Sequence, residues 1–172
     1  LSFKGVSFKE MHISAGGNVN FDLGSFQNSA GETFIVESGG KVQFRDRAFH
    51  ATKNLQNFTV IANSDIDFDS SSFNETSAVN ATIVSKSGSI YFYVAFGNCT
   101  NLSSITVKAA GSIRFYANSF SSSSIAFVDV SQYEENGKLK LLVDTGLTNS
   151  IIIYDSAFEN CNNLKEVSLS SA

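Results

Sequence analysis

Residues 95–120 read AFGNCTNLSSITVKAAGSIRFYANSF, and most of the chain is a looser copy of this stretch. Two short runs in it, 102–107 and 113–115, alternate apolar and polar residues, which is typical of β-strands with one buried face. Small residues at 109–112 separate the two runs. One copy cannot bury its apolar face alone, so the stretch predicts a fold built by repetition.

The apolar positions of this stretch recur at a nearly constant interval. The last apolar residue of each first run falls at Ile13, Val36, Val60, Val84, Val107, Val130 and Leu169, in steps of 23, 24, 24, 23, 23 and 39 residues. The first five second runs each end on a phenylalanine: Phe21, Phe44, Phe68, Phe92 and Phe115. Another phenylalanine closes each copy: Phe26, Phe49, Phe73, Phe96, Phe120 and Phe158.

Apolar columns that stay in phase over a period of about 23 residues indicate a solenoid. We predict an all-β, right-handed repeat solenoid, LRR-like or β-helix-like, with about seven coils and two short parallel strands per coil. Its core consists of Phe, Ile, Val and Leu, and brief helical turns are expected at least at the CxNL corners, residues 99–102 and 161–164. Gly31 and Thr82 replace larger interior residues, so their coils should pack loosely, while Ile83 is assigned to the outer face.

Length and composition exclude several classes of protein. The 172 residues are 42% hydrophobic with a net charge of −4, which argues against a nucleic-acid partner. No apolar run approaches the roughly 18 residues of a membrane span. Residues 1–172 are interpreted as a single solenoid, and because both ends lie inside a repeat, we expect a segment of a longer one. Residues 131–150 are an expected edge insertion with a strand near 139–143, either a surface excursion or a recognition projection.

Two copies share a fuller motif. Residues 95–107 fit AFxxCxxLxxIxV, and residues 157–169 match them in residue type, with Val167 and Leu169 at the last two apolar positions. This pattern, with its period, resembles the BspA-like leucine-rich repeats of bacterial and protist surface proteins, over residues 8–169. The other copies keep the apolar columns and replace the cysteine by Ser or Thr, and the proline usual after the family's first strand is absent here. The resemblance implies an extracellular or cell-surface, adhesive, non-enzymatic protein.

Tyrosines gather in the second half of one outward column. That column reads Asp22, Arg45, Asp69, Tyr93, Tyr116 and Tyr154, with Tyr91 in the neighbouring column. Stacked at strand spacing, these rings form either a structural ladder or an aromatic contact surface for sugar or protein. The candidate binding face is therefore Tyr91, Tyr93, Tyr116 and Tyr154.

Five Asn-X-Ser/Thr sequons raise the prospect of N-glycosylation. Asn74 and Asn98 lie in polar turns and are the better candidates, followed by Asn57 and Asn80. The fifth, Asn101, belongs to a series of asparagines before leucine and is interpreted as a turn residue.

Other reactive side chains have structural interpretations. Cys99 and Cys161 occupy one repeat position about two coils apart, too far for a disulfide, so both are expected to be buried thiols. Asp65, Asp67 and Asp69 share the outward face of one strand, but Ser70 and Thr76 stand where an EF-hand needs Gly and Glu.

A weaker carboxylate site involving Asp22 or Arg45 is an alternative to a solvated face. No nucleophile, paired-carboxylate or phosphate-loop pattern is present, and we predict no catalytic residue, cofactor or resident metal.

Two functions follow from these observations. The first is a binding or adhesion module at a cell surface that contacts protein or glycan through outward strand faces. The second is a structural subunit of an extracellular filament or sheath, with copies stacked end to end through open coil ends.

Overall fold

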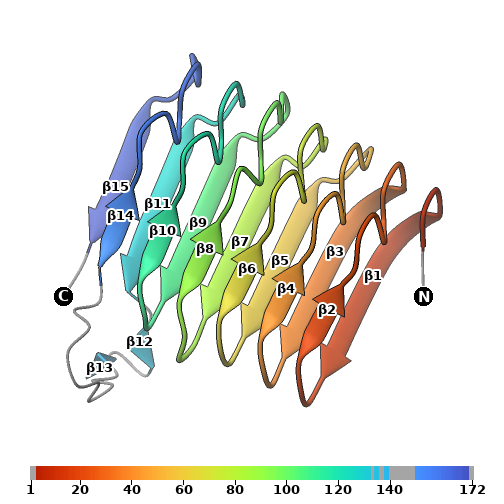
Figure 1. Ribbon diagram of the computed structural model, residues 1–172, viewed down its shortest axis with the longest axis horizontal. Helices are drawn as coiled ribbons and strands as arrows, with labels where there is room; N and C mark the ends of the chain where they lie inside the picture. The colour runs from red at the N-terminus through yellow and green to blue at the C-terminus, as the bar shows by residue number, and fades with distance from the viewer. Residues whose placement is uncertain (1–2, 133, 136–137, 140–149, 171–172) are drawn as a thin grey trace.

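Each copy of the repeat folds into one coil with a longer first strand and a three-residue second strand, and equivalent strands of successive coils pair in parallel (Figure 1). The computed structural model describes residues 3–132, 134–135, 138–139 and 150–170. In the first sheet the order is β1 (Ser7–Ala15), β3 (Ala30–Ser38), β5 (Asn57–Ala62), β7 (Asn80–Ser85), β9 (Ser104–Ala109), β11 (Phe127–Gln132) and β15 (Glu166–Ser170). The second sheet contains β2 (Val19–Phe21), β4 (Val42–Phe44), β6 (Ile66–Phe68), β8 (Ile90–Phe92), β10 (Ile113–Phe115) and β14 (Ile151–Ile153).

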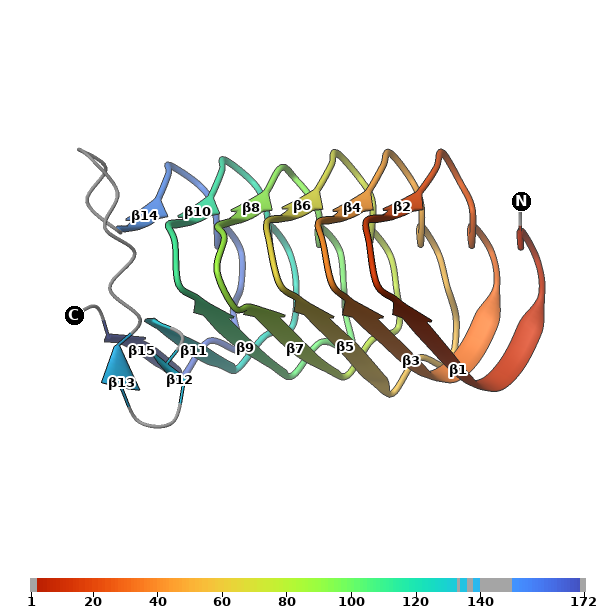
Figure 2. The same cartoon turned by 90° about the horizontal axis from the view of Figure 1, so that it is seen from below.

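The two sheets lie opposite each other along the whole stack (Figure 2). The predicted all-β solenoid of parallel strand pairs is thus confirmed. The number of coils is slightly lower than seven, because the sheets have seven and six strands and β15 has no second-type successor among the described residues. In the part of the chain that the structure describes, no helix is long and apolar enough to cross a membrane.

The last pairing of the second sheet spans an insertion. Ile113 pairs with Ile151, whereas earlier partners in this sheet are 23 or 24 positions apart. Between them, β12 (Glu134–Glu135) and β13 (Lys138–Leu139) form a small antiparallel pair. Most of the strand predicted near 139–143 lies outside the described residues.

Phenylalanine rings fill the space between the sheets in two columns. In the column from the second strands, Phe21, Phe44, Phe68, Phe92 and Phe115 stack with centroids 4.7, 5.0, 5.0 and 4.9 Å apart. Phe26, Phe49, Phe73, Phe96 and Phe120 form the second column, at 4.7, 4.8, 4.9 and 5.1 Å. These distances match the strand spacing of roughly 4.8 Å, so each coil adds one ring to each column.

The fourth coil corrects the predicted register by one residue. Val60 pairs with Ile83 and Ile61 with Val84, so Ile83 is buried and Thr82 is exposed. The prediction that Val84 closes the interior column, with Thr82 inside and Ile83 outside, is therefore wrong. The error has a simple cause: neighbouring strand residues face opposite sides, so a one-residue shift exchanges inside and outside. Ala81 is the small interior residue of this coil.

The corners are hydrogen-bonded turns rather than the expected helical turns, and the described residues contain no helix. Two positions per turn have a left-handed backbone conformation. One series is Gly24, Arg47, Ser71, Val94, Asn118 and Ser156, and the other is Asn28, Ala51, Glu75, Asn98, Ser122 and Asn160. A hydroxyl or thiol then donates to a carbonyl of the preceding coil, as Thr52 Oγ1 does to the Phe26 oxygen at 3.1 Å and Ser123 Oγ to the Phe96 oxygen at 2.6 Å.

Candidate functional site

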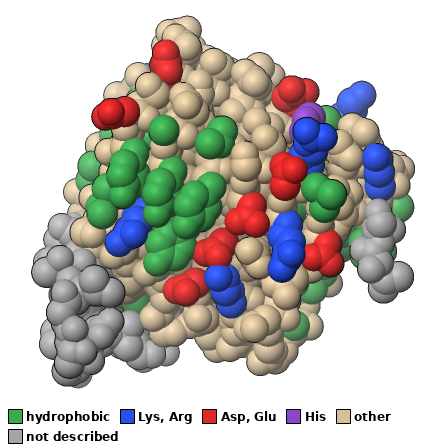
Figure 3. Space-filling view, in the orientation of Figure 1, with side chains coloured by type: hydrophobic (Ala, Val, Ile, Leu, Met, Phe, Trp, Pro, Cys, Tyr) green, Lys and Arg blue, Asp and Glu red, His purple; other side chains and the backbone are tan. Residues whose placement is uncertain are grey.

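The residue types on the outward face of the second sheet change along the stack. The central residues of its strands are Asn20, Gln43, Asp67, Tyr91, Arg114 and Ile152, and the residues just after the strands are Asp22, Arg45, Asp69, Tyr93, Tyr116 and Tyr154. Figure 3 shows the result: hydrophobic and tyrosine side chains gather on one half of this face, and acidic and basic ones alternate on the other. We call the half formed by Tyr91, Tyr93, Arg114, Tyr116 and Tyr154 the tyrosine face.

The four predicted tyrosines do lie together, as a stacked ladder. The ring centroids of Tyr93 and Tyr116 are 4.4 Å apart and those of Tyr116 and Tyr154 4.9 Å, with interplanar angles of 16° and 6°. Tyr91 stacks beside Tyr93 at 6.2 Å. Because Tyr116 has a ring on each side, it offers solvent its ring edge and hydroxyl group rather than a ring face.

Sequence reasoning missed Arg114, which lies in the middle of this face. The centre of its guanidinium group is 5.8 Å from the centroid of the Tyr91 ring, a cation–π contact. A hydrogen bond with Tyr116 is the main cause that raises the pKa of Arg114 above its ordinary value. The repeat could have identified Arg114 as a residue of this face, since Arg114 is the equivalent of Tyr91 in the next second strand.

The phenol group of Tyr93 stays protonated at neutral pH. Burial, followed by a hydrogen bond with Tyr116, raises the pKa of Tyr93 to about 12. A neutral phenol can both donate and accept a hydrogen bond. The tyrosine face therefore combines the positive charge of Arg114 with phenol hydroxyl groups on an aromatic surface.

The other half of the face consists of paired charges. Lys41 Nζ lies 2.5 Å from Asp67 Oδ2, and Arg45 Nε lies 3.5 Å from Asp22 Oδ1. Burial, and then repulsion by Asp67, raises the pKa of Asp69. Asp65 has a local role, because its Oδ1 accepts a hydrogen bond from the Ser89 N–H at 2.8 Å. Within the described ranges, no group of three His, Cys, Asp or Glu side chains could hold a metal ion.

The asparagines of the sequons differ in solvent exposure and in the hydrogen bonds of their side-chain amides. Asn57, Asn80 and Asn98 are exposed. Asn74 is half-buried, and both ends of its amide are engaged: Oδ1 accepts from the Gly97 N–H at 2.8 Å, and Nδ2 donates to Ser71 Oγ at 3.4 Å. The amide of Asn80 is also engaged at both ends, because its Oδ1 accepts a hydrogen bond from Ser104 Oγ at 2.9 Å and its Nδ2 donates to Asn57 Oδ1 at 3.5 Å.

Both cysteines are free, as predicted. Cys99 is fully buried, and its Sγ donates to the Phe73 carbonyl oxygen at 3.2 Å. Burial raises the pKa of the Cys99 thiol to about 11. Cys161 is half-buried, and burial raises its pKa as well.

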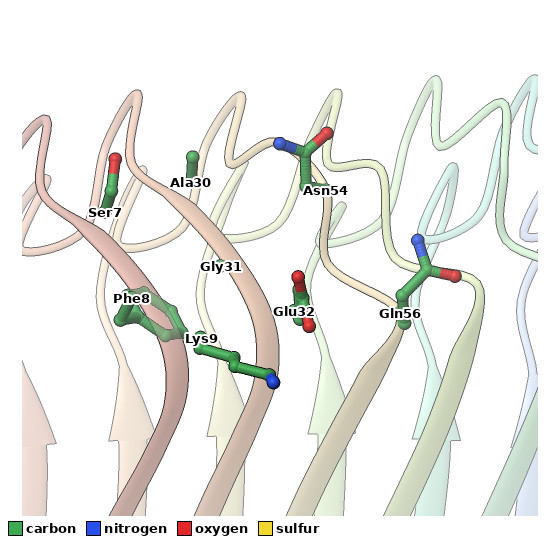
Figure 4. A pocket seen from close by; sticks show the side chains of 8 residues that line it. All are labelled: Ser7, Phe8, Lys9, Ala30, Gly31, Glu32, Asn54 and Gln56. Atoms are coloured by element: carbon green, nitrogen blue, oxygen red, sulfur yellow. The ribbon is translucent and has the colours of Figure 1, made fainter.

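A hollow of about 520 Å³ lies beside Gly31, at one of the coils predicted to pack loosely. The ring of Phe8 lies next to Gly31, while Lys9 and Glu32 extend over the hollow and the amides of Asn54 and Gln56 border it (Figure 4). A Cβ atom on Gly31 would lie only 2.1 Å from Cε2 of Phe8. Phe8 thus occupies part of the space that a leucine fills in other coils.

Comparison with known proteins gave one match. The family model described as the BspA type leucine rich repeat region matches residues 20–138 and 141–172, in six copies. Neither a curated protein nor a solved structure matches the chain.

Proposed function

Because the chain belongs to the BspA-type leucine-rich-repeat family, we propose that it is a cell-surface or extracellular binding module that contacts a partner protein through the tyrosine face. Members of this family are generally surface or extracellular and typically non-enzymatic. A solenoid of this kind offers extended surfaces to a partner.

The single observation that carries the proposal is the stacked column of Tyr93, Tyr116 and Tyr154 on the outward face of a sheet. Tyr93 and Tyr154 expose 37% and 41% of their surface. Tyrosine and arginine are enriched among the residues that dominate protein interfaces. Rings that are already stacked lose little conformational freedom on binding, which favours affinity.

The stacking also favours a protein over a sugar as the partner. A sugar ring that stacks on an aromatic residue needs an open ring face. Here the neighbouring tyrosines cover both faces of Tyr116 and one face of Tyr93. The exposed ring edges and hydroxyl groups suit the polar backbone and side chains of a protein partner.

The test combines capture from cell-surface extracts with matched variants. The chain and its Tyr93→Ala/Tyr116→Ala variant are immobilised, and retained proteins are identified and their affinities measured. We expect the double variant to bind the partner at least about tenfold more weakly. Thr106→Ala, on the outward face of the opposite sheet, should bind like the unchanged chain. Equal retention by the double variant, or glycan-array binding that ignores these tyrosines, would contradict the proposal.

For a chain made in a secretory pathway, the proposed N-glycan positions are Asn98, Asn57 and Asn80 rather than Asn74. Support comes from the exposure of the first three, whereas Asn74 is half-buried. Peptide mass spectrometry of the native protein tests this order. Full occupancy of Asn74 alone would reverse it.

A second candidate function is end-to-end association. Val167 and Leu169 occupy interior columns of the first sheet but are 42% and 49% exposed. A further coil would cover these two side chains. That coil can belong either to the same chain or to a second copy that pairs with β15. Light scattering of the full encoded protein over a wide concentration range tests this function. A constant monomer mass excludes it.

A further inference from the structure

Arg114 is a cation without an ion-pair partner in the described part of the chain. The ion pairs found there join His12 to Glu37, Lys41 to Asp67, Arg45 to Asp22 and Arg47 to Asp46. Arg114 instead has tyrosines around it, and its buried Nε has no hydrogen-bond partner. The groups that raise the pKa of Arg114 are all tyrosines: Tyr116, Tyr91 and Tyr154.

The surroundings hold the guanidinium group in place. It lies over the Tyr91 ring and interacts with Tyr116, and the strand β10 that carries it is paired on both sides. A guanidinium group offers several N–H donors in a planar fork that matches the two oxygens of a carboxylate. The buried Nε is out of reach of a partner, but an oriented guanidinium group without an ion-pair partner is poised to bind an anion through its terminal N–H groups.

Resting on the proposed function, we infer that Arg114, with the Tyr116 hydroxyl beside it, binds a carboxylate of an Asp or Glu side chain on the partner protein, at the centre of the tyrosine face. In this contact the single positive charge of the guanidinium group pairs with the single negative charge of the carboxylate. The ladder rings around it exclude water, as the rim of an interface does around its strongest contacts.

The charge distribution favours a single carboxylate over a polyanion. The chain has a net charge of −4. On the same face, two coils from Arg114, lie Asp67 and Asp69. With Asp22 they outnumber the cations of that half, Lys41 and Arg45, so its net negative charge disfavours nucleic acid and heavily sulfated glycans, whose many charges would extend over it. A lone side-chain carboxylate reaches Arg114 without crossing that half of the face.

Selection from a random seven-residue peptide library displayed on phage tests the inference without a known partner. The bait is the 172-residue chain, alongside Arg114→Gln, Tyr116→Ala and the control Arg47→Gln, which removes an exposed turn arginine. We expect Asp or Glu to be enriched at one position of peptides selected by the unchanged chain and by the control. With Arg114→Gln this enrichment should vanish, and the best acidic peptide should bind about tenfold more weakly or worse.

The alternative outcomes are distinguishable. Two outcomes overturn the carboxylate contact and leave the proposed function standing, provided that peptide binding depends on Tyr116. In one, the selected peptides show no enrichment of Asp or Glu; in the other, peptides selected by Arg114→Gln show the same enrichment as those selected by the unchanged chain. Failure to select any peptide above background, or selection that Tyr116→Ala does not change, overturns both. Binding of sialylated or sulfated glycans on an array, lost in Arg114→Gln, assigns the anion to a sugar and overturns the inference. Equal melting temperatures of all variants ensure that the comparison concerns binding.

Discussion

Single residues in the turns are constrained by backbone conformation. Gly24, Ser71 and Asn118 occupy one left-handed series, where glycine and asparagine are most easily accommodated. Val94 belongs to the same series with φ of 49°. A β-branched residue there is strained, because its Cβ substituents crowd the backbone. The repeat therefore contains one position whose side chain conflicts with its backbone.

Replacing Val94 by Asn should stabilise the protein by about 1 kcal/mol, since it relieves this strain and Asn118 shows that Asn fits the same turn. Urea unfolding followed by circular dichroism measures the change. Val79→Asn is the control, because Val79 is not in a left-handed conformation, and it should give no gain. Equal effects of the two substitutions would show that strain at Val94 is negligible.

The buried thiol of Cys99 predicts a loss of stability at alkaline pH. Its pKa is about 11 in the folded chain, against an ordinary value of 9.0. Below pH 9 the thiol is protonated in both states. Between pH 9 and 11 only the unfolded chain loses the proton, so the free energy of unfolding falls as pH rises, by at most about 1.4 kcal/mol per pH unit.

Cys99→Ser should remove this part of the alkaline loss while changing stability little at pH 7, because Ser29 and Ser123 occupy the same column and are buried. Urea unfolding from pH 7 to 11 measures the difference from the unchanged chain. Cys161→Ser, at the half-buried equivalent position, should retain most of the loss. Parallel pH curves for Cys99→Ser and the unchanged chain would contradict the assignment.

Within a coil, the interior corner column shows how neighbouring coils compensate for one another. Its members are Phe8, Gly31, Leu55, Ala78, Leu102, Ile125 and Leu164. Gly31 and Phe8 form a complementary pair, in which the large ring takes space left by the absent side chain. Phe8 also contacts Phe26 and Phe34, with centroids 6.1 Å away in each case. This pair predicts a coupled response to mutation.

Gly31→Leu should destabilise the chain by about 1–3 kcal/mol, because the leucine displaces the Phe8 ring. In a Phe8→Ala background the same change should cost much less, since the leucine then fills the corner as Leu55 and Leu102 do. A double-mutant cycle by urea unfolding measures this coupling. Additive effects of the two changes would show that Phe8 and Gly31 do not compete for the same space.

The strand registers also show where pattern reading fails. Outward Thr82 and inward Ile83 were exchanged in the prediction, because the run Thr-Ile-Val offers apolar residues at two consecutive positions. Alternation specifies a register only where apolar and polar residues strictly alternate. The actual register brings Thr59, Thr82 and Thr106 into one outward row.

For the molecule as a whole, parallel stacking converts repeat positions into continuous columns. The two phenylalanine columns and the tyrosine ladder both arise because each coil places its equivalent residue about 4.8 Å from the previous one. The face of the second sheet thus has a charged half and an aromatic half, which correspond to earlier and later coils. A binding surface on such a solenoid consists of side chains from several coils, and the tyrosine face draws on three.

Periodicity in the chain sufficed to predict the parallel solenoid, the buried phenylalanines and the tyrosine column, because a regular repeat places equivalent residues in line whatever the details of the turns. Contacts between columns could not be predicted that way. The position of Arg114 over Tyr91, the engaged amide of Asn74 and the ring of Phe8 beside Gly31 depend on side-chain directions and on packing across coils. Such lateral contacts arise only when the coils are assembled. The repeat specifies which residues are neighbours along a column, but it does not specify which side chains meet between two columns.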